Sequence, residues 1–299
     1  MITGKTRLIG LLGDPVNHSL SPSMHNAALK KMGLDWCYLA LPCKKNALSQ
    51  VLDGLYFSGC KGLNITIPHK SNVAKLCKEL TPLAKKLGAV NTVLPNPAGG
   101  WTGDNTDMEG FLDPLKKIKL NTNGNATIVG CGGSARAVIA GLEELNFKEI
   151  TIIGRNKNSL EKFLIDTKGM DTGNSSQLNV KILLDSDPNV INFIRKSTLI
   201  VNTTPIGMNK ADEDEKIRKS MPISEKVWNH LTPDTILYDL IYTPRPTAWL
   251  QNGKLMNCRT IDGLEMLISQ GAASLRLWSG IQEIPINLMR EAAEIQLKR

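Results

Sequence analysis

The segment from Ala126 to Ile153 constrains the fold of this chain more than any other part of the sequence. A short apolar run, Ala126 to Val129, leads into the glycine-rich loop Gly130-Cys131-Gly132-Gly133-Ser134-Ala135. A helical pattern follows from Ala135 to Leu145, and a second apolar run spans Ile150 to Ile153. This order and these lengths predict a βαβ unit with two parallel strands.

The loop of this unit also suggests a ligand. Its pattern, Gly130-x-Gly132-x-x-Ala135, matches the dinucleotide-binding fingerprint with alanine in the third place. Glycine permits the tight turn and the close approach of a pyrophosphate, which the free N–H groups of the following helix attract. A plain strand-to-helix turn is the alternative, and the two flanking strands favour nucleotide binding. The predicted cofactor-binding residues here are Gly130, Gly132, Gly133, Ser134 and Ala135.

The end of the second strand indicates which nucleotide is bound. The sequence there is Gly154-Arg155-Asn156-Lys157, without the acidic residue that binds the ribose hydroxyls of NAD. A guanidinium can bind a 2′-phosphate through two hydrogen bonds, so Arg155 favours NADP over NAD, with Asn156 and Lys157 beside it. The alternative for Arg155 is an ordinary exposed arginine.

The rest of the chain alternates apolar runs with helical patterns, which predicts an α/β fold. Met24, Ala28 and Met32 recur at helical spacing after Ser21-Pro22, so Ser21 is expected to cap that helix. Gly99-Gly100 predicts a hairpin turn. Further strands are expected at Leu8 to Leu12, Trp36 to Leu41, Gly62 to Ile67, Ala89 to Leu94, Thr198 to Asn202 and Thr235 to Leu240, and surface loops at Gly169 to Asn179 and Asn209 to Lys226.

Composition excludes several classes of protein. With 299 residues the chain can form two domains, and its 41% hydrophobic residues include no membrane-length run. The apolar run near the amino terminus is too short for a signal peptide, so a cytoplasmic location is expected. The six cysteines lack metal-binding spacing and are expected to be free thiols. The net charge of +8 is spread along the chain, so neither nucleic acid nor membrane is an expected partner.

Two polar motifs upstream of the glycine loop predict the chemistry. Asn64-Ile65-Thr66-Ile67-Pro68-His69-Lys70 ends in a lysine, and Gly103-Asp104-Asn105-Thr106-Asp107 ends in a carboxylate. A lysine held by a carboxylate can accept and return a proton. Taken singly, Lys70 could be a solvated lysine and Asp107 a helix cap. Asn64, Thr66, Asn91 and Thr106, in and near these motifs, can supply further hydrogen-bond donors and acceptors.

Several motifs in one order resemble those of the shikimate dehydrogenases. They are Ser19-Leu20-Ser21-Pro22, residues 64–70, Gly88-Ala89-Val90-Asn91-Thr92, residues 103–107, the glycine loop, Tyr238-Asp239-x-x-Tyr242 and Gly263 to Gln270. The resemblance implies an oxidoreductase of two domains that reduces 3-dehydroshikimate to shikimate with NADPH, on the pathway to chorismate and the aromatic amino acids.

The same resemblance implies roles for single residues. Ser19 and Ser21 would hold the substrate carboxylate, Lys70 and Asp107 would form the catalytic pair, and Gln270 would contact substrate. Tyr242 would border both ligands. Thr203, Met208 and Gly263 match segments beside the cofactor. His69 and Gly154 depart from residues common in the family, and the loops after Lys168 and Met208 are enlarged.

The resemblance also implies a domain organisation. Residues 1–107 and 263–299 would form an α/β substrate domain with a mostly parallel sheet, and residues 108–262 an inserted Rossmann-type NADP-binding domain. The chain would act on a small-molecule substrate as a monomer or a homodimer. Two alternatives remain: a quinate/shikimate dehydrogenase that uses NAD or NADP, and a catalytically silent regulatory relative.

Overall fold

The chain folds into two compact units. The computed structural model describes residues 2–168, 178–208 and 220–298. One unit is formed by Met1–Gly110 together with Leu267–Arg299, and the other by Phe111–Met266. These boundaries differ by three and four residues from those expected at 107 and 263, because the chain passes from one unit to the other inside two helices. These helices are α5 (Asp107–Lys116) and α12 (Leu264–Ser279).

The first unit is built on a mixed sheet of six strands. Their order is β2-β1-β3-β5-β6-β4, and β1 pairs in parallel with both β2 and β3, whereas β5 is antiparallel to its two neighbours. Its elements are β1 (Arg7–Gly13), α1 (Ser21–Lys31), β2 (Trp36–Pro42), the short 3₁₀ helix η1 (Lys45–Ala47), α2 (Leu48–Phe57), β3 (Gly62–Ile65), α3 (Lys70–Leu76), β4 (Glu79–Leu80), α4 (Pro82–Leu87), β5 (Thr92–Pro95), β6 (Trp101–Asp104) and α13 (Ile286–Leu297).

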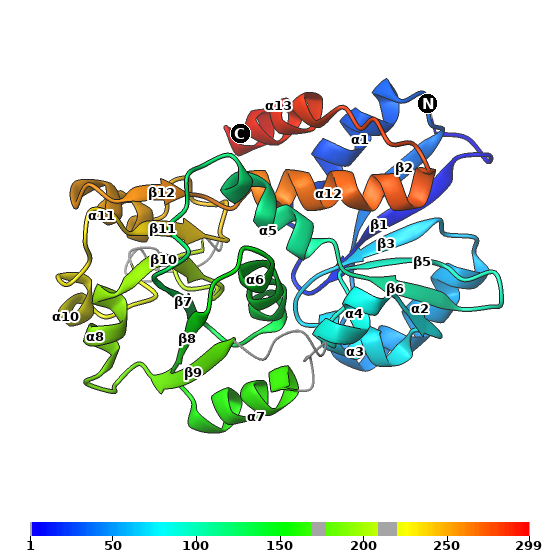
Figure 1. Cartoon of the computed structure of the whole chain (residues 1–299). Coiled ribbons are helices and arrows are strands. Elements are labelled where there is room, and N and C mark those ends of the chain that lie inside the picture. The colour runs from blue at the N-terminus through cyan, green and yellow to red at the C-terminus, as the bar shows by residue number, and fades with distance from the viewer. Residues whose placement is uncertain (1, 169–177, 209–219, 299) are drawn as a thin grey trace. The chain divides into compact units, whose positions relative to one another are not determined.

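Apolar residues explain how this unit is layered. Leu12, Leu63 and Val93 from three strands pack with Leu52 of α2 and Val73 of α3 in one buried cluster. α1 packs beside α13, so the carboxyl-terminal segment completes the layer that begins near the amino terminus (Figure 1). The predicted hairpin turn at residues 99–100 joins β5 to β6, and the sequence prediction of this connection is confirmed.

The second unit contains a sheet of six parallel strands in the order β12-β11-β10-β7-β8-β9. The central strand β7 carries the glycine-rich loop at its carboxyl end. The elements are β7 (Asn125–Val129), α6 (Gly133–Glu144), β8 (Glu149–Gly154), α7 (Lys157–Lys168), β9 (Asn179–Leu184), α8 (Val190–Arg195), β10 (Ser197–Asn202), α10 (Glu225–Trp228), β11 (Ile236–Asp239), α11 (Ala248–Leu255) and β12 (Arg259–Ile261).

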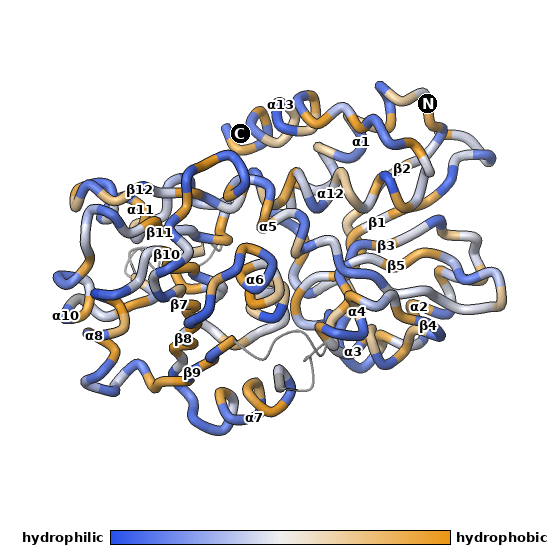
Figure 2. The backbone as a smooth tube through the Cα atoms, in the orientation of Figure 1, coloured by the Kyte–Doolittle hydropathy of each residue, from blue (hydrophilic) through white to orange (hydrophobic). Residues whose placement is uncertain are grey.

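Burial of both faces explains the continuous apolar runs in this sheet. All five residues of β7 are buried, and so are the four residues Ile150 to Ile153 within β8. Hydrophobic residues predominate along β8 (Figure 2). The α/β class and the Rossmann-type order expected from the sequence are therefore confirmed.

Two helix starts differ from the sequence expectations, and two expected loops fall largely outside the described residues. α6 begins at Gly133, two residues before the expected start at Ala135, so the last glycine of the loop is already helical. Ser21 is the first residue of α1 and not its cap, because Leu20 occupies that position without a side-chain cap. The loops expected at 169–179 and 209–226 lie largely outside the described residues.

Candidate active site

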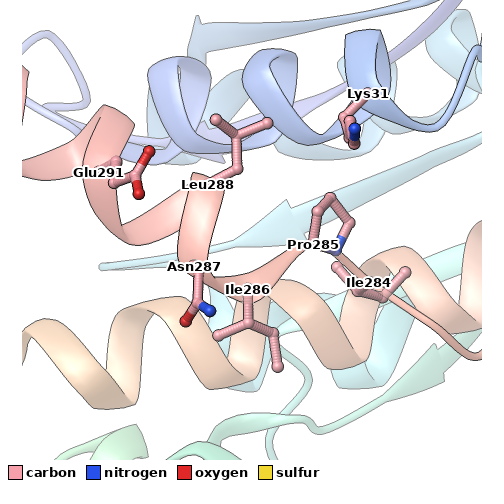
Figure 3. A pocket seen from close by; sticks show the side chains of 7 residues that line it. All are labelled: Lys31, Ile284, Pro285, Ile286, Asn287, Leu288 and Glu291. Carbon is pink, nitrogen blue, oxygen red and sulfur yellow. The ribbon is translucent and has the colours of Figure 1, made fainter.

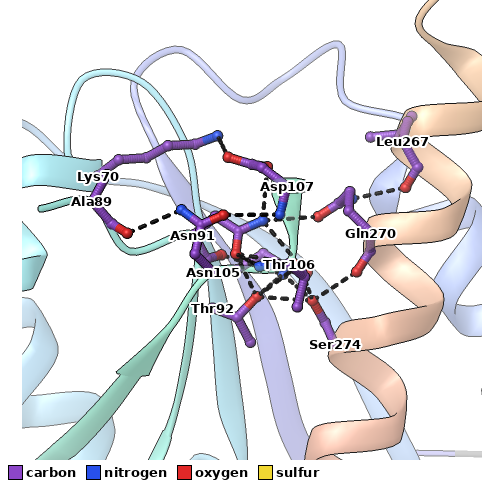
Figure 4. A network of polar contacts seen from close by, with 11 residues as sticks. Lys70, Ala89, Asn91, Thr92, Asn105, Thr106, Asp107, Leu267, Gln270 and Ser274 are labelled. Atoms are coloured by element: carbon purple, nitrogen blue, oxygen red, sulfur yellow. Dashed lines mark hydrogen bonds and ion pairs between the residues drawn. The ribbon is translucent and has the colours of Figure 1, made fainter. Parts of the chain in front are cut away.

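Lys70 and Asp107 form an ion pair in the first unit. Lys70 begins α3, Asp107 begins α5, and their Nζ and Oδ2 atoms lie 2.5 Å apart (Figure 4). The lysine side chain is 14% exposed and that of the aspartate is 6% exposed. The pair expected from the sequence is thus present, with a small opening to solvent on the side of the lysine.

The second oxygen of Asp107 is also held. Its Oδ1 accepts a hydrogen bond from Asn91 Nδ2 at 2.8 Å, and its backbone N–H donates to Asn105 Oδ1 at 3.0 Å. Asn91 Oδ1 in turn accepts from the backbone N–H of Thr106 at 2.7 Å. A buried carboxylate needs such partners, and the amino-terminal turn of α5 adds favourable N–H dipoles. These bonds fix the direction in which Asp107 meets Lys70.

Strand pairing brings the separate motifs together. The backbone N–H of Ile65 donates to Asn91 O at 2.7 Å, and that of Val90 donates to Lys70 O at 2.9 Å. In the hairpin, Thr92 stands opposite Asp104. Gly103 is required in this hairpin because a Cβ atom there would lie 2.6 Å from a methyl of Val90. Motifs that are far apart in sequence therefore meet at the end of β3 and β5.

A network of polar side chains extends from this pair. Gln270 Oε1 accepts from Asn91 Nδ2 at 3.3 Å, while Gln270 Nε2 donates to Leu267 O at 2.8 Å. Thr106 Oγ1 accepts from Asn91 Nδ2 at 2.9 Å. Asn64 is linked to the network through Thr92, at 3.2 Å. The structure therefore brings Asn64, Asn91, Thr106 and Gln270 together with the ion pair in one network.

Other predicted residues lie apart from this network. Ser19 and Ser21 are buried, and the backbone N–H of Ser21 donates to Ser19 Oγ at 3.2 Å. Thr66 is half-buried and its methyl group lies against Gly13, where a Cβ atom would be 2.3 Å away. Tyr242 is half-buried and belongs to the second unit.

The structure adds residues that sequence reasoning missed. Thr92 and Ser274 are fully buried and share hydrogen bonds with the predicted residues, and the hydroxyl of Tyr38 donates to Asn64 Oδ1 at 2.9 Å. Ser274 lies four residues after Gln270, so helical spacing could have placed it on the same face. No sequence signal links Tyr38 to Asn64.

His69 precedes Lys70 and is fully buried. Its Nε2 donates to Cys43 O at 2.7 Å, and Nδ1 has no hydrogen-bond partner among the described residues. The carbonyl can only accept, so Nε2 carries the hydrogen of this bond. His69 therefore anchors the turn before α3 from inside the first unit.

The glycine loop of the second unit has the features that a pyrophosphate requires. Gly130 has φ = +105°, and a Cβ atom there would lie 2.6 Å from Thr203 Oγ1. At Gly132 a Cβ atom would meet nothing within 4 Å. α6 begins without an acidic first turn or a side-chain cap, so its first N–H groups are available to an anion. The residues present therefore fit a dinucleotide phosphate.

Residues around this loop have defined structural roles. The hydroxyl of Thr203 donates to Val129 O at 2.8 Å, which holds the segment after β10 against the end of β7. Met208 is half-buried. Gly263 is buried against the backbone of Leu240, whose oxygen would be 2.1 Å from a Cβ atom. The glycine at 263 is thus required by the close approach of two chain segments.

The residues after β8 form an exposed turn. Asn156 Oδ1 accepts from the backbone N–H of Ser159 at 2.9 Å, so it stabilises the start of α7. Lys157 Nζ lies 3.8 Å from Glu161 on the surface. Arg155 is exposed and lines a cavity of about 520 Å³ together with Asp185, Pro205 and other residues. An exposed guanidinium beside a cavity is suited to binding an anionic group. The carboxylate of Asp185, which lines the same cavity, would repel such a group.

A second cavity, of about 540 Å³, lies beside the start of α13 in the first unit (Figure 3). It contains none of the predicted site residues. The residues that line it are Lys31, Ile284, Pro285, Ile286, Asn287, Leu288 and Glu291. This cavity is therefore separate from the candidate active site.

All six cysteines are free thiols, as expected. In the described part of the chain, no group of histidine, cysteine and acidic residues could hold a metal ion. Among the helices described, none has both the length and the apolar character needed to cross a membrane.

Comparisons with known proteins agree with the geometry. The model of the shikimate dehydrogenase substrate-binding domain matches residues 11–93, and that of the shikimate 5'-dehydrogenase C-terminal domain matches residues 263–294. The chain is 46% identical over 297 residues to a shikimate dehydrogenase (NADP(+)) of Prochlorococcus marinus strain MIT 9215, covering 99% of this chain and 100% of that protein.

Two solved structures have the same fold over nearly the full length. A shikimate dehydrogenase in complex with NADP+ has a TM-score of 0.83 and 35% identity, covering 100% of this chain and 98% of that chain. The shikimate 5-dehydrogenase of Thermus thermophilus, in complex with NADP(H) and shikimate, has a TM-score of 0.81 and 29% identity, covering 97% of this chain and 100% of that chain.

Proposed function

The chain belongs to the shikimate dehydrogenase family, and we propose that it reduces 3-dehydroshikimate to shikimate reversibly with NADPH. The observation that carries this proposal is the Lys70–Asp107 ion pair inside a network of hydrogen-bonding side chains. A small polyhydroxylated substrate needs such donors and acceptors, and an alcohol–ketone reaction needs a group that moves a proton. Its product would lead to chorismate and the aromatic amino acids.

We assign the proton transfer to Lys70. Reduction of a ketone adds a hydride to carbon and a proton to oxygen, and NADPH supplies the hydride when it is bound. The ammonium of Lys70 donates the proton in this direction, and its amine accepts the hydroxyl proton in reverse. Asp107, fixed by Asn91, holds Nζ at one place.

Substrate recognition is assigned to the first unit and one residue of the second. Ser19 and Ser21 would bind the substrate carboxylate, because Ser19 Oγ accepts from a backbone N–H and can still donate its own hydrogen. The ring hydroxyls would be bound by Asn64, Thr66, Asn91, Thr106, Tyr242 and Gln270. The first unit is accordingly proposed to be the substrate domain.

NADP binding is assigned to the second unit. The loop would hold the pyrophosphate through Gly130, Gly132, Gly133, Ser134 and Ala135, and Arg155 would bind the 2′-phosphate. Asn156, Lys157, Thr203, Met208 and Gly263 complete the proposed cofactor contacts. Lys157 can assist because its surface pair with Glu161 is weak.

Steady-state rates test this proposal against its nearest alternative. The enzyme should oxidise shikimate with NADP faster than quinate with NADP or either substrate with NAD. Equal or faster turnover of quinate with NAD would instead support a quinate/shikimate dehydrogenase. Absence of turnover with all four pairs would support a regulatory relative, a role that the buried Lys70–Asp107 pair does not favour.

Two further properties are proposed with the function. We expect a cytoplasmic location, which fractionation of the source cells would test. We also expect a monomer or a homodimer, which light scattering coupled to size-exclusion chromatography would distinguish from larger assemblies.

A further inference from the structure

The amide of Asn64 is held from both ends by residues that the proposed mechanism does not use. Its Oδ1 accepts from the hydroxyl of Tyr38 at 2.9 Å. Its Nδ2 donates to Ser274 Oγ at 2.8 Å and lies 3.2 Å from Thr92 Oγ1. Asn64 is 4% exposed, so few of its hydrogen-bonding positions can be taken by water. These partners come from β2, α12 and β5.

Tyr38 is a rigid donor. It is fully buried, and its ring stacks on that of His25 with 4.0 Å between the ring centroids. Its backbone N–H donates to Asn26 Oδ1 at 2.9 Å, and its carbonyl accepts from Asn26 Nδ2 at 2.8 Å. With the main chain and the ring both fixed, the hydroxyl has a single position from which to reach Asn64.

Ser274 is a rigid acceptor. It is fully buried on α12, and its hydroxyl donates to the carbonyl of Gln270 at 3.0 Å. Its lone pairs are therefore available to the Nδ2 group of Asn64. The same oxygen lies 2.9 Å from Thr92 Oγ1 and 3.2 Å from Thr106 Oγ1 (Figure 4). Through Ser274, Asn64 is therefore joined to the network around the Lys70–Asp107 pair.

The two neighbours together select one orientation of the amide. Rotating the Asn64 amide by half a turn would place Nδ2 against the donating hydroxyl of Tyr38. It would also place Oδ1 against Ser274, whose hydrogen is directed to Gln270. Both contacts would then be lost, and buried polar groups without partners are costly. In the observed orientation, both hydrogens of Nδ2 face protein oxygens, and one lone pair of Oδ1 remains.

We propose that Tyr38 and Ser274 are positioning residues that fix the Asn64 amide with its oxygen available to accept a hydrogen bond from a substrate hydroxyl. Neither residue touches the substrate in this arrangement. The inference rests on the proposed function, because it takes Asn64 as a substrate-binding residue. It assigns the polarity of one contact: the substrate group that faces Asn64 is a donor.

The experiment measures KM for shikimate in Tyr38→Phe and Ser274→Ala. Each change removes one hydroxyl and should raise KM about threefold to tenfold, with kcat changed less than about twofold and KM for NADP unaltered. Ser279→Ala is the matched control, because Ser279 makes the same type of bond to Leu275 O in α12 and should leave KM unchanged.

Double variants that also carry Asn64→Ala distinguish a positioning role from a general loss of stability. In Asn64→Ala, adding Ser274→Ala or Tyr38→Phe should not raise KM further, since the group they position is gone. An unchanged KM in both single variants, or an equal rise in the Asn64→Ala background, would overturn the inference while leaving the proposed function standing. A wild-type protein that does not oxidise shikimate would overturn the proposed function, and the inference with it.

Discussion

Lys70 Nζ lies 2.5 Å from Asp107 Oδ2, although 37 positions separate the two residues in the sequence. Each begins a helix, and the β3, β5 and β6 strands set the distance between those helix starts. Neither side chain is fully exposed, so the pair is fixed by the protein and not only by mutual attraction across solvent.

Replacing Lys70 tests its assignment as the proton donor. Lys70→Ala should lower kcat on the order of a hundredfold or more, because general acid–base catalysis contributes about that much, and NADP binding should be nearly unchanged. Steady-state kinetics and a nucleotide titration measure the two effects. Lys75→Ala, at an exposed position of the same helix, is the control. An unchanged kcat would refute the role.

Arg155 tests the preference for NADP. Arg155→Ala should weaken NADP binding much more than NAD binding, because only NADP carries the 2′-phosphate that the guanidinium would bind. Dissociation constants of NADP and NAD for the wild type and the variant measure this difference. Lys162→Ala, at another exposed position, is the control. Equal losses for the two nucleotides would remove the 2′-phosphate assignment.

Ser19 is a sharper test of carboxylate binding than Ser21. Ser21 begins α1, so its replacement also perturbs the helix, whereas Ser19 precedes that helix. Ser19→Ala should raise KM for shikimate and change kcat less. If KM for shikimate stayed at the wild-type value, Ser19 would have only a structural role.

Two glycines of the loop should behave differently. Gly130→Ala puts a methyl group at a positive φ and 2.6 Å from Thr203 Oγ1, so it should cost about 1–3 kcal/mol of unfolding free energy. Gly132→Ala meets no neighbour and should change stability by about 0.5 kcal/mol or less, while its methyl group occupies space proposed for the pyrophosphate. Urea unfolding measures the stability of the two variants, and NADP titration measures their affinity for the cofactor. Equal stability of the two variants would contradict the steric argument.

His25 should make the first unit sensitive to acid. Burial lowers the pKa of His25 from 6.5 to about 4, against the opposing hydrogen bond to the Ser21 carbonyl. A group whose pKa is lowered on folding contributes stability that is complete above pH 6.5 and is lost as the pH falls towards 4. The shift corresponds to about 3 kcal/mol.

The measurement compares urea unfolding of the wild type and His25→Gln between pH 7 and pH 4. The wild type should lose more free energy of unfolding than the variant over this interval. Burial raises the pKa of Asp239 to about 6, which acts in the opposite direction, but Asp239 is present in both proteins and cancels in the difference. Parallel pH profiles would contradict the prediction.

The sequence predicts the parts of this molecule that depend on local pattern. β7, the glycine loop, α6 and β8 were predictable because buried parallel strands are continuously apolar and the loop has a fixed glycine spacing. β9 was missed because its residues are half-buried or exposed at the edge of the sheet, where the apolar signal is weak.

The site was predictable only in part. Lys70, Asn91 and Asp107 stand in polar motifs that are recognisable from the order of the amino acids alone. Tyr38 and Ser274 could not be named as partners of Asn64, because their contacts depend on which strands are neighbours and on how α12 is rotated. Similarly, Ser21 has a side chain suited to helix capping, but α1 already begins at Ser21, so the cap position falls on Leu20.

The first unit is assembled from both ends of the chain, and this has a consequence for its synthesis. A ribosome releases Asn64, Thr92 and the Lys70–Asp107 pair long before it makes Ser274, which is the partner that closes their network. All residues of the second unit precede that helix turn, so this unit can fold first. The first unit is therefore incomplete until translation is nearly finished, and a truncated product that lacks α12 and α13 would lack Gln270 and Ser274 of this network.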